Sequence, residues 1–141
     1  MGAVDAISAR VAAAVLAAVA PDGDQPLDVA FLVDGSGSVG TAGFALSQTF
    51  VAELAAAFAP GAGDADNRVG VVQYSSESAQ TLEIALADGV SSYAVSQAVA
   101  AMSFHNGATY TDTGIDYVQA HVFGGGGARD GAARVLIVLT D

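Results

Sequence analysis

The chain has 141 residues, 52% of them hydrophobic and 13% charged, which is the composition of a globular domain and excludes a disordered chain. Fifteen acidic residues against four basic ones give a net charge of −11, which argues against nucleic acid and anionic membrane as partners. The lack of cysteine excludes disulfides, thiol nucleophiles and cysteine-ligated zinc. No apolar run is long enough to span a bilayer, so no membrane insertion is expected.

Residues 1–26 are predicted to form an Ala-rich helix followed by a linker. Apolar side chains recur on one face of this helix, at Val4, Ile7, Val11, Val15 and Ala18. Two interpretations stay open. The segment is either an amphipathic helix that packs on the domain, or a signal peptide with a cleavage-like tripeptide at residues 18–20. Asp5 in the supposed basic region and Pro21 just after the cleavage site argue against the signal peptide.

Strands and helices alternate along residues 27–141. Buried strands are predicted at 27–33, 68–74 and 134–139, a half-exposed edge strand at 80–86, and helices at 40–58, 91–102 and 111–123. The inward stripe expected for the first of these helices is Leu46, Phe50, Leu54 and Phe58. This order predicts an α/β fold with a doubly wound, mostly parallel sheet, helices on both faces, and the first strand near the middle. The apolar run 134–139 is expected to be a central parallel strand.

Oxygen-bearing side chains follow the predicted strands where a sheet of this kind binds ligands. Asp34, Ser36 and Ser38 come directly after the first strand, Thr109 lies in a loop before a helix, and Asp141 follows the last strand. Two carboxylates and three hydroxyls, completed by water, suit a small hard cation such as Mg²⁺ or Mn²⁺.

Two other functions fit parts of the same turn. Gly35, Gly37 and Gly40 match the dinucleotide-binding spacing, but Asp34 would repel a pyrophosphate and no ribose-binding acid follows the second strand. A serine hydrolase would need a nucleophile elbow, which is absent around Ser36. The only possible bases are His105 and His121; we interpret His121 as a surface residue and His105 as an ordinary loop residue near the site.

Four stretches together resemble the von Willebrand factor A domain with a metal-ion-dependent adhesion site. Asp34-Gly35-Ser36-Gly37-Ser38 looks like its first loop, Gly107-Ala108-Thr109-Tyr110-Thr111 like its Thr-bearing loop, and Arg134 to Asp141 like its strand ending in Thr-Asp. The stretch from Arg68 to Ser75 resembles the second strand of the extracellular-matrix subgroup, as in matrilins and collagen VI. The resemblance covers residues 27–141, in the same order and at the same spacing.

The resemblance implies roles for five residues. Ser36, Ser38 and Thr109 would coordinate the metal through their hydroxyls, and Asp34 and Asp141 mainly through bound water. One coordination position would stay open for a carboxylate from a protein partner. Because neutral hydroxyls leave the cation under-neutralised, it would keep a strong attraction for an external Asp or Glu.

The resemblance also implies further helices and strands after the Thr-Asp motif, where this sequence stops. We therefore expect an incomplete C-terminal sheet, with the last strand as an apolar edge. The predicted function is non-enzymatic, metal-dependent protein binding of the adhesion type, outside the cell or at its surface. The alternative is a cytoplasmic module that docks an ATPase partner in a metal-chelatase-like complex.

Overall fold

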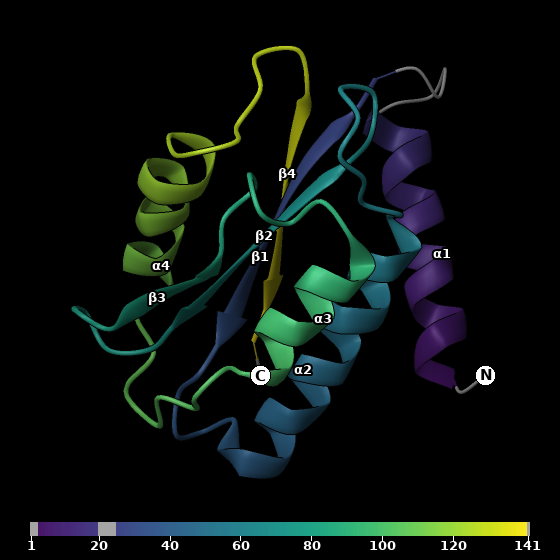
Figure 1. Cartoon of the computed structure of the whole chain (residues 1–141). Helices are drawn as coiled ribbons and strands as arrows, with labels where there is room; N and C mark the ends of the chain where they lie inside the picture. Colours follow the sequence, from purple (N-terminus) through teal and green to yellow (C-terminus); the bar gives the residue numbers. More distant parts are fainter. Residues whose placement is uncertain (1–2, 20–24, 141) are drawn as a thin grey trace.

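A four-stranded sheet with strand order β3-β2-β1-β4 lies at the centre of the computed structural model, which describes residues 3–19 and 25–140 (Figure 1). β1 (Leu27–Asp34) pairs in parallel with both β2 (Arg68–Tyr74) and β4 (Ala133–Leu139). β3 (Gln80–Ile84) pairs antiparallel with β2 at one edge. The predicted α/β fold, with a mostly parallel sheet and the first strand inside it, is confirmed.

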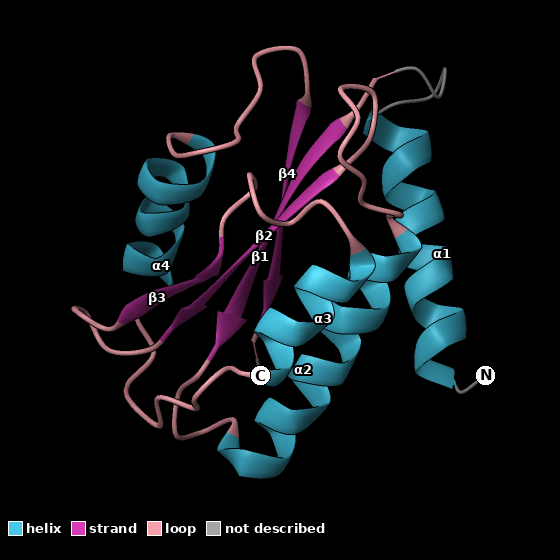
Figure 2. Cartoon of the chain, viewed as in Figure 1, coloured by secondary structure: helices cyan, strands magenta, loops and turns pink. Residues whose placement is uncertain are grey.

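The helices cover both faces of this sheet, as predicted. They are α1 (Ala3–Val19), α2 (Gly40–Ala57), α3 (Ser92–Ala100) and α4 (Thr111–Val118), the last continued by a π-helical segment η1 (Gln119–Phe123). Figure 2 shows α2 and α3 on one face and α4 on the other. Ser91 caps α3 by accepting a hydrogen bond from the backbone nitrogen of Ala94 through its hydroxyl, and so fixes where that helix begins.

All eight residues of β1 are buried, and their alternation divides the core in two. Val29, Phe31 and Val33 pack in the cluster shared with α2 and α3. Ala30 and Leu32 point to the opposite face and pack with Val118 of α4 and its neighbours. A strand covered on both faces is held in place by the whole core, so the turn that follows it is attached to the most rigid part of the fold.

The inward face of α2 differs from the prediction. Leu54 and Phe58 are buried as expected, but Leu46 is 69% exposed and Phe50 only partly buried. A helix turns about 100° per residue, so residues spaced by four drift about 40° at each step and leave the core side after three steps. Phe44 and Val51 take the inward positions in their place.

Helix α1 lies beside α2 (Figure 1). Its buried positions are Ser8 and Ala12, with Val11 and Val15 partly buried, whereas Ile7 is 49% exposed, so the packed face is rotated from the predicted one. Ala12 packs in the core cluster that also contains Phe44 and Val51 of α2. The cleavage-like tripeptide ends at Ala20, outside the described residues. Among those residues, no helix combines the length and apolarity needed to cross a bilayer.

Within the described residues, strand β4 lies at the edge of the sheet, as the resemblance implies, and not at the central position expected from its apolar run alone. It is parallel, as predicted, and partly exposed along its length. At the amino end of the strands, Arg129 holds the segment that leads into β4. Its guanidinium donates to Oδ1 of Asp28 at 2.8 and 3.0 Å and to the carbonyl of Leu27 at 3.0 Å.

Candidate metal site

The turn after β1 is built around the Asp34 carboxylate, which is 1% exposed. Its Oδ1 accepts a hydrogen bond of 2.8 Å from the backbone nitrogen of Ser36, and its Oδ2 one of 2.7 Å from the hydroxyl of Thr140. A Cβ at Gly35 would collide with the side chain of Gln73, so only glycine fits between Asp34 and Ser36. The carboxylate is therefore fixed in one orientation by its own loop and by the end of β4.

Two hydroxyls of this turn lie together. The Oγ atoms of Ser36 and Ser38 are 3.0 Å apart, close enough for one to donate to the other. Ser36 is buried and Ser38 is exposed, so the pair runs from the end of the strand to the surface. Pairing these two oxygens with a buried carboxylate gives three hard ligands within one five-residue turn.

The loop that carries Thr109 docks against this turn. The backbone nitrogen of Gly37 donates to the carbonyl of Gly107 at 2.8 Å, and that of Asn106 to the carbonyl of Gly35 at 2.9 Å. Asn106 has φ of 56°, a left-handed conformation that asparagine tolerates and that bends the loop toward the turn. Figure 2 shows both loops at the end of the sheet to which the β1 arrow points.

Thr109 itself is exposed, and its two neighbours in the chain are held by β2 and the turn after it. The nitrogen of Ala108 donates to the hydroxyl of Ser76 at 3.0 Å, and that of Tyr110 to the carbonyl of Ser75 at 2.9 Å. The structure thus brings Asp34, Ser36 and Ser38 together and sets the Thr109 loop beside them. Asp141, the fifth predicted ligand, lies outside the described residues.

The donor set is rich in oxygen atoms, which are the ligands that hard divalent cations prefer. Among the described residues, no three His, Cys, Asp or Glu side chains come together as a metal cluster. A cation at this turn would therefore be held largely by hydroxyl oxygens, which suit Mg²⁺ or Mn²⁺ better than a soft metal.

Sequence reasoning did not predict the parts that Thr140 and His105 play in the structure. Thr140 directly follows β4, which pairs with β1 so that Val33 faces Leu139, and this register places Thr140 beside Asp34. His105, interpreted from the sequence as an ordinary loop residue, makes two side-chain hydrogen bonds of 2.9 Å. Its Nδ1 meets the hydroxyl of Ser75, and its Nε2 that of Thr81. Burial lowers the pKa of the His105 imidazole.

A second polar residue lies under the Thr109 loop. The buried amide of Gln73 accepts a hydrogen bond from the backbone nitrogen of His105 at 2.8 Å and donates to the carbonyl of Ser103 and to Oε2 of Glu83. Burial raises the pKa of the Glu83 carboxyl, and the bond from Gln73 opposes this rise. Gln73 therefore connects the start of the loop to both central and edge strands.

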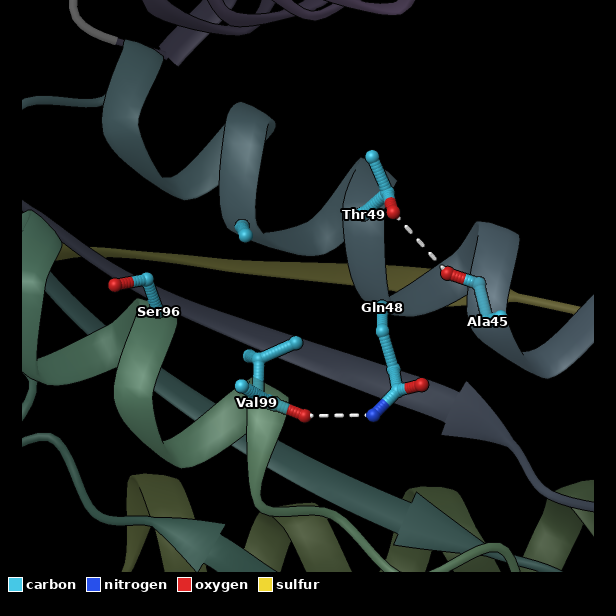
Figure 3. A pocket seen from close by; sticks show the side chains of 7 residues that line it. Ala45, Gln48, Thr49, Ser96 and Val99 are labelled. Atoms are coloured by element: carbon cyan, nitrogen blue, oxygen red, sulfur yellow. Dashed lines mark hydrogen bonds between the residues drawn. The ribbon is translucent and has the colours of Figure 1, made fainter.

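A hollow of about 380 Å³ between α2 and α3 does not compete with this site. Figure 3 shows its polar lining, in which Gln48 donates to the carbonyl of Val99 and Thr49 to that of Ala45. Its lining carries no charged side chain, and the polar groups of Gln48 and Thr49 are already paired within the protein. The hollow therefore lacks the carboxylate that the turn after β1 supplies.

A model of the von Willebrand factor type A domain matches residues 28–141. Mouse vitrin (Mus musculus) is 33% identical over 114 residues, which are 81% of this chain and 17% of vitrin. The human collagen alpha-1(VI) chain (Homo sapiens) is 40% identical over 119 residues, 82% of this chain and 11% of the collagen chain. This chain thus spans less than a fifth of these relatives. They are extracellular matrix proteins rather than enzymes, which agrees with the predicted extracellular localisation.

Solved structures of a mussel protein share the fold. Proximal thread matrix protein 1 from the mussel byssus, in a form with a zinc-occupied MIDAS motif, is 25% identical, with a TM-score of 0.75. The match covers 84% of this chain and 31% of the mussel chain. In that protein the adhesion site holds a divalent metal.

Proposed function

Since this chain belongs to the von Willebrand factor type A domain family, we propose that it is a metal-dependent protein-binding module of the extracellular, adhesion type. A divalent cation, Mg²⁺ or Mn²⁺, binds directly to the hydroxyls of Ser36, Ser38 and Thr109. Asp34 and Asp141 hold it mainly through bound water. A carboxylate of a protein partner then occupies the remaining coordination position. The zinc-occupied site of the mussel neighbour supports a divalent cation in this fold, and the matrix relatives favour this function over the cytoplasmic, ATPase-docking alternative.

The observation that carries the proposal is the pairing of the Ser36 and Ser38 hydroxyls at 3.0 Å beside the buried carboxylate of Asp34. One of these hydroxyls is buried, where an unused polar group is costly, and the other is exposed to an incoming ligand. A cation would take both oxygens at once. With few anionic ligands its charge stays available, which is what recognition of an acidic side chain requires.

Partner binding can be tested separately from folding. The immobilised chain is exposed to extracellular matrix proteins extracted from the source, in Mg²⁺ and in EDTA, and compared with the Thr109→Ala variant. We expect proteins that are retained in Mg²⁺ and released by EDTA, and no retention by Thr109→Ala. The control is Thr49→Val, because Thr49 lies on α2 and its hydroxyl bonds only within that helix. Proteins that stay bound in EDTA and to Thr109→Ala would contradict the metal-bridging function.

A further inference from the structure

We propose that His105 is a positioning residue, whose ring holds the Thr109 loop in its metal-binding conformation without touching the metal. This inference rests on the proposed function. His105 begins the loop, and Thr109 lies four residues further on. The ring is bonded at both nitrogens, to Ser75, which directly follows β2, and to Thr81 on β3. It therefore fixes the start of the loop to β3 and to the residue after β2 at once.

Ser75 fastens the loop at both ends. Its hydroxyl bonds to Nδ1 of His105, and its backbone carbonyl accepts from the nitrogen of Tyr110. Between these two points, the nitrogen of Ala108 donates to the hydroxyl of Ser76. Residues 105–110 therefore wrap around a dipeptide that continues a buried strand. The two loop residues bonded in this way, Ala108 and Tyr110, are the ones that flank Thr109.

The loop backbone lies close against the two serines at Gly107. A Cβ at Gly107 would lie 2.7 Å from the Ser76 hydroxyl and 3.0 Å from that of Ser75. The backbone of Gly107 thus lies directly on the two serines while its carbonyl accepts from Gly37 of the first metal-binding turn. If the His105 ring is removed, the Ser75 hydroxyl loses its partner, and the start of the loop keeps its backbone bonds to Gln73 and Gly35 but no side-chain tie to Ser75 or Thr81.

Supporting residues of this kind change metal affinity by roughly 10- to 100-fold when they are removed. We therefore expect the His105→Ala variant to bind Mn²⁺ at least about tenfold more weakly in calorimetric titration. The matched control is His121→Ala, because His121 is the chain's other histidine and lies exposed on η1. It should bind Mn²⁺ as the unmodified chain does.

A double-mutant cycle shows whether His105 acts through Thr109. Thr109→Ala should bind Mn²⁺ more weakly but measurably, and adding His105→Ala to it should weaken binding no further, because the ligand that His105 positions is already gone. Additive losses would overturn the inference. Should His105→Ala fail to fold, Thr81→Val removes only the partner of Nε2 at an exposed position and should give a smaller loss of the same kind.

Hydrogen exchange in the metal-free chain gives a readout that is independent of metal binding. In His105→Ala, the amides of Ala108 and Tyr110 should exchange faster, while those inside β1 should not change. Unchanged exchange at both loop amides would overturn the inference. If the unmodified chain binds no Mn²⁺, the proposed function fails and the metal part of this inference fails with it. If the unmodified chain binds Mn²⁺ and the His105→Ala variant binds it equally tightly, only the inference about His105 fails.

Discussion

The hydroxyl of Thr140 donates a hydrogen bond of 2.7 Å to Oδ2 of Asp34 and so ties together the ends of two neighbouring parallel strands. Asp34 is buried and Thr140 is exposed, so this bond lies at the surface side of the turn. The other carboxylate oxygen is held by the backbone of Ser36. Thr140 thus sets the direction of the Asp34 carboxylate without belonging to the predicted ligand set.

Thr140→Val keeps the shape of the side chain and removes its hydroxyl. Oδ2 of a buried carboxylate then loses a partner, so we expect the free energy of unfolding of the metal-free chain to fall by about 1–3 kcal/mol. Urea unfolding measures this loss. Thr49→Val is the control, because its hydroxyl bonds only within α2, and it should cost less than about 0.5 kcal/mol. Equal stability of the two variants would mean that the bond to Asp34 contributes nothing.

Arg129→Ala tests the attachment at the opposite end of the sheet. Asp28 is fully buried and forms an ion pair with Arg129 at 2.8 Å. Removing the guanidinium leaves a buried carboxylate unpaired, so we expect a loss of about 3–5 kcal/mol in the free energy of unfolding. Arg10→Ala, on the exposed side of α1, should change it by less than about 0.5 kcal/mol. A small effect of Arg129→Ala would show that solvent reaches Asp28.

The His105 imidazole should make stability depend on pH. Because burial lowers its pKa below the ordinary value of 6.5, protonation favours the unfolded chain. The contribution of His105 to stability is therefore complete above pH 6.5 and is lost as the pH falls from there through the lowered pKa. Glu83 changes stability with pH in the opposite direction. Because its pKa is raised in the folded chain, its ionisation lowers stability as the pH rises above 4.5.

Urea unfolding across this pH range checks the prediction. His105→Ala should lose the decline below pH 6.5, whereas His121→Ala should retain it, and the Glu83→Gln background removes the opposing contribution. A decline of the same size in His105→Ala and in the unmodified chain would assign it to other groups.

Most of the fold could be predicted from the sequence because the strands are short apolar runs separated by strong turn residues. The stretch 27–34 is buried on both faces, so its apolar run predicts a strand without any alternation of polar and apolar residues. The inward face of α2 is harder to predict. Leu46 and Phe44 are both large apolar residues, and only the packing against β1 and α3 decides which of them is buried. The apolar run of β4 alone favours a central position, because such a run does not reveal strand pairing. Its edge position within the described residues is expected only from the resemblance.

The candidate site could be predicted as far as its residues are adjacent in sequence or follow a strand. Asp34, Ser36 and Ser38 share one turn, so their proximity follows from the chain itself. The bonds of His105 reach 30 residues back to Ser75 and 24 back to Thr81, and depend on how the β2–β3 hairpin lies under the loop. No local pattern in the sequence encodes that contact.

Ser38→Ala should separate metal binding from folding. Ser38 is exposed, and the one side-chain hydrogen bond shown for it is the 3.0 Å contact with Ser36. The free energy of unfolding of the metal-free variant should therefore differ from that of the unmodified chain by less than about 0.5 kcal/mol. Mg²⁺ should raise the melting temperature of the unmodified chain and not that of Ser38→Ala, because only the former gains stability from binding. Ser96→Ala, in the hollow between α2 and α3, is the control (Figure 3). A rise of the same size in Ser38→Ala would exclude Ser38 as a ligand.

Calorimetric titration of the chain with Mg²⁺ and with Mn²⁺ tests the central claim most directly. The account predicts a single site for each ion, binding that is strongly weakened in Ser38→Ala and in Thr109→Ala, and complete reversal by EDTA. Absence of binding at millimolar concentrations of both ions, or binding that persists unchanged in both variants, would contradict the assignment of a divalent-cation site to this end of the sheet.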